Sequence, residues 1–320
     1  MHQIEMVSLN DLVPQAHMYR QFSKYWSFAS VEKELACLEQ DNRYKGYGML
    51  TLFKCLLLQF MEDLSDRELA RFLQENTAAK WFCGFTLCQQ TPHFTVFTRM
   101  RARLGTKRLS RIFADLRDQL KSQSLMNEVF NFVDATHLIA KATLWQERDK
   151  AIKAKYDTLN NEVLPKVAKD TQARIGCKGK NKFWYGYKQH VSVDMQSGLI
   201  NKVAITPANL SDGQGLAHIC PRRGAVFGDK AYCLRSARKA AAKRMCHLAA
   251  VKKNNMKSKN RDQDHWYTKI RAPYERVFSK QNKRVRYRGI AKNQFASFFG
   301  AICFNLKRIT VLEPPDFCLI

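Results

Sequence analysis

The sequence predicts an α/β protein in two parts, an all-helical N-terminal domain followed by a mixed α/β domain. Up to about residue 124, apolar side chains recur at helical spacing. From about residue 131, short apolar runs typical of buried strands alternate with helical segments. With 320 residues, 45% of them hydrophobic, the chain can form two cores. We place the domains at residues 1–125 and 126–310, and a tail at 311–320.

In the N-terminal part, residues 31–124 have helical patterns. Leu50–Phe60 is mostly apolar and predicts a buried helix, and Ser65–Glu68 has the pattern of a capping box that starts the next one. Thr91-Pro92 opens a further segment, in which four apolar residues form one helical face. Those residues are Phe94, Phe97, Met100 and Leu104.

Three arginines lie on that last helix, away from its apolar face: Arg99, Arg101 and Arg103. Short helices joined by tight turns, with basic residues on the last helix, suit a helix-turn-helix-like DNA-binding domain. An ordinary helical bundle with solvated arginines fits the same composition equally well.

The second part begins with the strand pattern NFVDATHLIA and continues with a charged, helical insertion over residues 145–180. A hairpin follows, because the strand patterns Tyr185–Asp194 and Leu199–Thr206 are joined by the turn-like MQSG. We then expect a short helix at Ser211–Ile219, a strand at Gly224–Gly228, a helix at Leu234–Met245, a strand at His247–Lys252 and a helix from Pro273.

The chain is strongly basic, and its charge is concentrated. Fifty-four Lys and Arg against 28 Asp and Glu give a net charge of +26. Between Arg235 and Arg288 there are 18 basic residues and three acidic ones. A concentrated positive field attracts phosphate backbones and makes binding sensitive to salt. We therefore expect nucleic acid as the partner.

Three acidic residues stand in unusual surroundings. Asp134 lies in the apolar run VFNFVDATHLIA, and Asp229 ends the apolar run AVFGDKAY. Glu275 is the only acid between Lys269 and Arg288. A charge at a buried strand is costly unless it is paired or binds metal. Asp134 and Asp229 could meet at one sheet edge, and Glu275 could complete the set from a helix packed across it.

Such a set suits metal-dependent phosphodiester chemistry. Two divalent ions about 4 Å apart activate a water molecule and stabilise charge at phosphorus, when carboxylates hold them. Mg²⁺, or Mn²⁺ in its place, prefers oxygen ligands and retains some water, so three acids can suffice. Strand-end aspartates are also common as caps or ion-pair partners, and spacing alone does not exclude that role.

These motifs resemble bacterial insertion-sequence transposases of the DDE class, the closest group being the one named after insertion sequence five. The resemblance rests on FVDAT, TPANLSD, FGDKAY and RAPYER in order, with KFWYGYKQHVSVDMQSGLI between the first two acids. LLLQFMEDLSDREL in the helical part is similar as well. Together the matching segments extend from about Tyr44 to Leu306.

The resemblance implies a ribonuclease-H-like catalytic domain that uses two-metal phosphoryl transfer. Asp134, Asp229 and Glu275 match the three catalytic, metal-binding acids, and Arg271 matches the arginine that precedes the glutamate. Two positions depart from the family pattern. Thr268 stands where the family has Tyr, with Tyr267 beside it, and Asn282 stands where it has Lys.

Several further residues are candidates for DNA contact: Lys230, Arg271, Lys280, Lys283, Arg284 and the three arginines near residue 100. Trp266 has polar neighbours in DQDHWYTK, which suits stacking on a distorted or flipped base. Trp184, Tyr185 and Tyr187 interleave with lysines; we favour the core for Tyr185 and Tyr187.

The remaining polar residues of the second part have simpler interpretations. Asp194 precedes a Ser-Gly turn and Asp212 is placed to cap a helix, so a structural role is favoured for both. For His137, a packing role is favoured over a catalytic one. His190 alternates with Val191 and Val193 and is interpreted as surface or polar lining near the site.

The ten cysteines include no C-x-x-C pair, and most lie in apolar contexts, which favours free thiols in a reduced compartment. The N-terminus lacks the pattern of a signal peptide, and no apolar run is long enough for a membrane span. We expect a cytoplasmic, bacterial protein that associates with the nucleoid and not with a membrane.

The sequence therefore predicts a transposase that binds the inverted repeats at its element's ends, cuts them and joins them to target DNA. Because two ends must be brought together, we expect a homodimer in the complex with double-stranded DNA. One alternative is a metal-dependent nuclease that cuts without joining. Another is a DNA-binding relic that has lost catalysis, although the presence of all three acids weighs against it.

Overall fold

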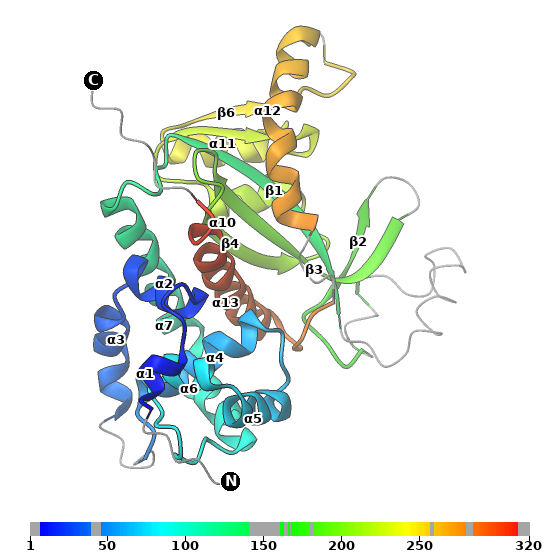
Figure 1. Cartoon of the computed structure of the whole chain (residues 1–320). Coiled ribbons are helices and arrows are strands. Elements are labelled where there is room, and N and C mark those ends of the chain that lie inside the picture. The colour runs from blue at the N-terminus through cyan, green and yellow to red at the C-terminus, as the bar shows by residue number, and fades with distance from the viewer. Residues whose placement is uncertain are drawn as a thin grey trace, which may run out of the picture. The chain divides into compact units, whose positions relative to one another are not determined.

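The computed structural model describes residues 7–39, 46–140, 161–162, 166, 168–178, 182–256, 259–279 and 284–312, with side chains except at 182, 271, 272 and 275–279. The chain forms two compact units (Figure 1). Unit 1 contains Met1–Ser124 and Phe298–Ile320, and unit 2 contains Leu125–Ser297.

Unit 1 is helical throughout the part that the structure describes. Its largest buried element is α4 (Met49–Met61), where Phe53, Leu56 and Leu57 are fully enclosed. Ser65 starts α5 with the predicted capping box, in which its hydroxyl accepts from the Glu68 amide. The other helices are α1 (Leu9–Leu12), α2 (Met18–Tyr25), α3 (Ala29–Glu39), α5 (Asp66–Glu75), α6 (Thr77–Cys83) and α7 (Phe94–Ser122).

The C-terminal part of α13 (Ile290–Ile309) packs within unit 1, whereas the sequence interpretation extended the second domain to residue 310. Phe299 is fully buried and stacks on Phe60, with the ring centroids 4.8 Å apart. Cys303 is also buried, and its thiol donates to the Leu57 carbonyl. Burial of this apolar face against α4 explains the difference. Most of the expected tail lies outside the described residues.

Helix α7 has the predicted apolar face, since Phe97, Met100 and Leu104 are fully buried. Its three arginines differ from one another in environment. Arg101 forms a two-pronged ion pair with Asp66 of α5, with N–O distances of 2.6 and 2.7 Å. Arg103 donates to the Leu38 carbonyl, and Arg99 is exposed. Two of the three guanidinium groups are thus tied to their own unit.

Unit 2 is built on one mixed sheet, in the order β2-β3-β1-β5-β6, with β4 also paired to β3. The long strand β3 pairs antiparallel with β1, β2 and β4, whereas β5 pairs parallel with β1 and β6. The strands are β1 (Phe130–Ile139), β2 (Arg174–Lys178), β3 (Lys182–Asp194), β4 (Ile200–Pro207), β5 (Gly224–Gly228) and β6 (Cys246–Ala250).

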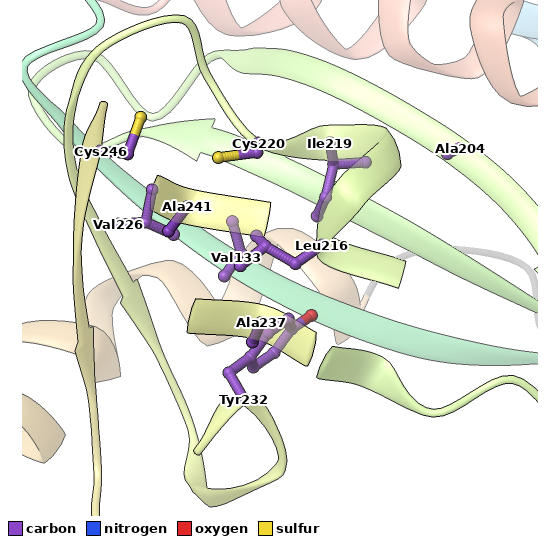
Figure 2. Close-up of a cluster of buried hydrophobic side chains, with 10 residues drawn as sticks. All are labelled: Val133, Ala204, Leu216, Ile219, Cys220, Val226, Tyr232, Ala237, Ala241 and Cys246. Atoms are coloured by element: carbon purple, nitrogen blue, oxygen red, sulfur yellow. The ribbon is translucent and has the colours of Figure 1, made fainter. Parts of the chain in front are cut away.

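Helices cover both faces of this sheet. Val133 and Val226 point to the face that packs against α10 (Asp212–Ile219) and α11 (Arg235–Lys243), in the buried cluster of Figure 2. The other face carries α12 (Arg261–Ser279), which contacts β1, β5 and β6 (Figure 1). Successive residues of a strand point to opposite faces, so Phe132 and Phe227 lie beneath α12.

A second buried cluster lies around the N-terminal part of β3. Tyr185 and Tyr187 are buried here, which confirms the preference for the core over DNA contact. Both phenol groups donate to Asp170, Tyr185 to its carbonyl and Tyr187 to its carboxylate. Burial raises the pKa of Tyr185 to about 12, and the neighbouring Asp170 charge adds to this effect.

Several strand and helix predictions are confirmed in type and differ at their bounds. The hairpin β3–β4, strand β5, helix α11 and strand β6 all occur where the sequence placed them. Helix α12 begins at Arg261, well before the predicted start at Pro273, which lies inside it. Residues 174–178 form strand β2, not helix. Most of the rest of the predicted insertion lies outside the described residues.

Each cysteine in the described part of the chain is a free thiol. Cys55, Cys83 and Cys303 are buried within unit 1, as their apolar contexts indicated. Within the same part of the chain, none of the helices is both long and apolar enough to cross a lipid bilayer.

Arg101→Ala should destabilise unit 1 by about 1–3 kcal/mol at pH 7, because it leaves the partly buried Asp66 without its main partner. Burial would raise the pKa of Asp66, but its hydrogen bonds, chiefly from Arg101 and Gln59, outweigh this and lower it. The stabilisation is therefore full above the unfolded carboxyl pKa of about 3.9 and is lost as the pH falls through the folded value.

Chemical denaturation of wild type, Arg101→Ala and the exposed control Arg99→Ala, at pH 7 and pH 3, measures this effect. We expect Arg99→Ala to change stability by less than about 0.5 kcal/mol at both pH values. An Arg101→Ala protein of wild-type stability that binds DNA poorly would contradict the structural role of Arg101.

Candidate active site

Strands β1 and β5, which pair directly, carry the first two predicted acids at and beyond the end of their pairing. The strands pair in parallel, with Phe130 opposite Ala225 and Phe132 opposite Phe227. Continuing this register by two residues places Asp134 opposite Asp229. The hydrogen-bonded pairing itself ends at Phe132 and Phe227. Adjacent strands lie about 4.8 Å apart, so the two acids would occupy neighbouring positions if the register continues. Each has the same strand parity as the phenylalanine two residues before it, and both therefore lie on the α12 face.

Asp229 is fixed by the turn that ends β5. It is the N-cap of a single turn of 3-10 helix, η2 (Lys230–Tyr232), and its Oδ1 accepts from the Ala231 amide at 2.8 Å. Gly228 is required beside it, since a Cβ there would lie 2.9 Å from the buried Tyr232 ring. The motif GDKAY thus encodes a strand end, a capped turn and the ring that packs behind it.

Asp134 lies within β1, beyond the buried pair Phe132 and Val133. Its Oδ1 accepts from the Ala135 amide at 2.7 Å. Both Asp134 and Asp229 are partly exposed, in contrast to the fully buried residues before them. Two neighbouring, partly hydrated carboxylates repel each other, and a cation that binds between them relieves that repulsion.

Helix α12 carries the third predicted acid across the same face. The Tyr267 ring packs against Phe227, with the centroids 5.9 Å apart, and the Tyr274 ring packs against Phe132 at 6.2 Å. Tyr274 also donates its hydroxyl hydrogen bond to the Met195 carbonyl in the β3–β4 turn. Glu275 follows Tyr274 directly in the helix. These contacts attach the helical turn that bears Glu275 beside the strand that bears Asp134.

The donor set suits a hard divalent cation. Asp134 and Asp229 offer only oxygen atoms, the ligands that Mg²⁺ and Mn²⁺ prefer. Among the side chains that the structure describes, no three His, Cys, Asp or Glu residues gather as a metal cluster. The side chain of Glu275 falls outside that description, so its part in the site stays a prediction.

Two other acids of the second part of the chain, Asp194 and Asp212, have structural roles. Asp194 is buried in the β3–β4 turn, where its Oδ2 accepts from the Ser197 amide and hydroxyl. Asp212 is not the cap of α10, because Ser211 takes that position in a capping box with Gln214. Asp212 instead pairs with Lys188, 2.8 Å from its Nζ.

His190 is not at the surface, which was one of the two interpretations of the sequence. It pairs with Ala135, the residue after Asp134, and its side chain lies on the α10 side of the sheet. It is fully buried between β3 and α10, where Thr206 Oγ1 lies 2.8 Å from its Nε2. A Cβ on Gly215 would lie only 2.2 Å from the ring, so α10 approaches β3 closely at this point. Burial lowers the pKa of His190 to about 4 and keeps the ring neutral at pH 7.

The predicted DNA-contact residues fall into three groups. Lys230 and Trp266 are exposed near the acids; the Trp266 ring contacts Phe227, and Lys230 donates to Asn254. Arg284 is exposed, and its backbone bridges to Ile139 at the far end of β1. Arg271 lies in α12, but its side chain is outside the description, and Lys280 and Lys283 lie outside the described residues entirely.

Comparison with known proteins adds two family matches and one structural likeness. The family described as "Transposase DDE domain" matches residues 130–306, which include all three predicted acids. The family described as "Transposase domain (DUF772)" matches residues 7–103. The cryo-EM structure of a piggyBac transposase synaptic complex with hairpin DNA is similar over 92% of this chain and 75% of that one. The identity is 9% and the TM-score 0.41, too low to support an inference.

Tyr274→Phe should weaken divalent-metal binding several-fold, because it removes the hydrogen bond to Met195 that holds this turn of α12 on the sheet. Tyr267→Phe, on the same helix, is the matched control, since among the described residues its hydroxyl hydrogen-bonds only with the neighbouring Gln263. Titration with Mn²⁺ followed by electron paramagnetic resonance measures the binding. Equal affinity in the wild type and Tyr274→Phe would show that the tyrosine does not position a metal ligand.

Proposed function

The chain belongs to the transposases that carry the DDE domain, and on that premise we propose that it cuts and joins the ends of an insertion sequence. It is a DNA transposase, an enzyme that cleaves DNA and transfers the cut strand by phosphoryl transfer. Its group within the family is proposed to be the one named after insertion sequence five. The observation that supports the proposal is the parallel register of β1 and β5, which, continued by two residues, would set Asp134 beside Asp229.

We propose that unit 2 has a ribonuclease-H-like fold. In support, three antiparallel-linked strands lie beside two parallel ones, in the order β4-β3-β1-β5-β6. Helices on both faces are consistent with that fold. In that fold, Asp229 would lie at the end of β5, and Asp134 would lie at the neighbouring position of β1, which continues beyond it.

Members of this family use divalent metal ions, and Mg²⁺, or Mn²⁺ in its place, is the proposed cofactor. Bound ions would activate the attacking water and stabilise charge at phosphorus. Asp134, Asp229 and Glu275 would hold them. The chain contributes preorganisation: the β1–β5 pairing, the capped turn at Asp229 and the ring contacts of α12 set the ligands before DNA binds.

DNA contacts are proposed around this site and on unit 1. Lys230 and Trp266 are exposed near Asp229, which suits contact with a phosphate and stacking on a displaced base. Arg271, Lys280, Lys283 and Arg284 would add phosphate contacts. In unit 1, Arg99 is the exposed member of its trio and the best placed to contact the inverted repeat. Because two ends must meet, a homodimer is proposed for the DNA complex.

Asp229→Asn and Glu275→Gln should each reduce metal-dependent nicking at the element boundary by at least about 100-fold, because each removes a charged metal ligand. Binding to the end duplex should change little. The assay uses purified protein, labelled duplexes that carry the element's ends, and a Mg²⁺ titration, with nicking and binding measured in parallel.

Asp262→Asn is the matched control, since Asp262 is an exposed acid on the same helix as Glu275 and should leave nicking unchanged. Nicking that persists in Glu275→Gln would remove this residue from the site. Binding by the wild type without cleavage under Mg²⁺ or Mn²⁺ would instead favour an inactive DNA-binding protein.

A further inference from the structure

Helix α11 presents a basic surface on the side of the sheet away from α12. Its buried residues, Ala237 and Ala241, face the sheet, and small side chains there let the helix pack closely. The opposite side of the helix is exposed and basic. We name this surface the α11 patch and define it by Arg222, Arg223, Arg238, Lys239, Lys243 and Arg244, all of them exposed.

The patch is continuous across two segments of the chain. Arg222 and Arg223 directly precede β5, and Arg244 comes just before β6. Gly224 pairs with Cys246 at the start of those two strands, so both segments emerge at the same sheet edge. From there, Lys243, Lys239 and Arg238 continue along α11 toward its N-terminal end. Nine residues of helix span about 13 Å, a length along which duplex DNA carries roughly eight phosphates.

Ion pairs do not neutralise this charge in the described structure, although Glu128 lies near Cys246 and Arg244 at the edge of the patch. None of the six side chains forms an ion pair there, although ion pairs hold other cations such as Arg101 and Lys188. Asp229 is the only acidic residue between Arg222 and Arg244, and it lies on the α12 face. Six uncompensated cations repel one another, so they favour binding a polyanion over facing water alone.

We propose that the α11 patch binds the backbone of the target duplex, the DNA into which cut ends are inserted. The inference rests on the proposed transposition function and deepens it. Strand transfer brings a second duplex to the carboxylates, where one of its phosphates is attacked, and that duplex extends beyond the site. Helix α11 begins six residues after Asp229, so its outer side, on the other face of the sheet, is placed to hold the flanking backbone. The exposed side chains of α11 offer cations and alanine but no amide group. Such a surface contacts phosphates without selecting sequence, which suits target DNA better than a specific element end.

The test is a triple substitution that removes charge and retains helix propensity: Arg238→Gln, Lys239→Gln and Lys243→Gln. The control retains charge at the same positions: Arg238→Lys, Lys239→Arg and Lys243→Arg. Each protein, checked for wild-type circular dichroism, is given element-end duplexes and a labelled target duplex of unrelated sequence. Nicking of the ends and joining to the target are measured from 50 to about 200 mM salt, a range over which phosphate contacts weaken strongly.

We expect the glutamine variant to nick ends within twofold of the wild type and to join them to the target at least tenfold less well at the higher salt. The salt slope of target binding should fall by about 2 to 3, and the charge-retaining control should behave as the wild type does. Wild-type joining by the glutamine variant would overturn the proposal. Nicking that falls in parallel with joining would also overturn it, because the patch would then bind element ends. A wild-type protein that fails to nick would refute the proposed function instead.

Discussion

The parallel pairing of β1 with β5 is the interaction on which the rest of the site depends. Because these strands are far apart in the sequence, only their hydrogen-bonded register gives Asp134 and Asp229 corresponding positions, two residues beyond the last pair, Phe132 and Phe227. Parallel pairing requires a long crossover, and here the segment that contains β2, β3, β4 and α10 provides it. A shift of one residue would turn one carboxylate to the other face and separate the pair.

That register is protected from both sides. On one face, Val133 and Val226 share a buried cluster with α10 and α11, including the Tyr232 ring that follows Asp229 (Figure 2). On the other face, Phe132 and Phe227 hold α12 through aromatic contacts. Asp134 and Asp229 come two residues after Phe132 and Phe227, where the side chains are partly exposed. The same layers that stabilise the sheet therefore place the carboxylates on the α12 face and the basic surface of α11 on the opposite one.

The sequence could predict the features that depend on local pattern. Asp134 and Asp229 stand out in the sequence as candidates because an acid in or directly after an apolar strand is costly without a partner. Features that depend on distant partners could not be predicted. Arg101 resembled a DNA contact, since its ion pair with Asp66 forms only when α5 meets α7. His190 resembled a surface residue because it alternates with valine, but the residues on both faces of this part of β3 are buried, so the alternation says nothing about burial. The early turns of α12 are polar, and Pro273 resembled a helix start.

The most direct measurement of the central claim, that three acids from β1, β5 and α12 form one metal site, is cleavage of the protein chain by bound iron. Fe²⁺ replaces Mg²⁺, and ascorbate with peroxide then generates hydroxyl radicals that cut backbone close to the ion. Cuts are expected near residues 134, 229 and 275 together, all suppressed by excess Mg²⁺ and lost in Asp229→Asn. Cuts near residues 134 and 229 without any near 275 would remove α12 from the site. Cutting that persists in Asp229→Asn would contradict the claim itself.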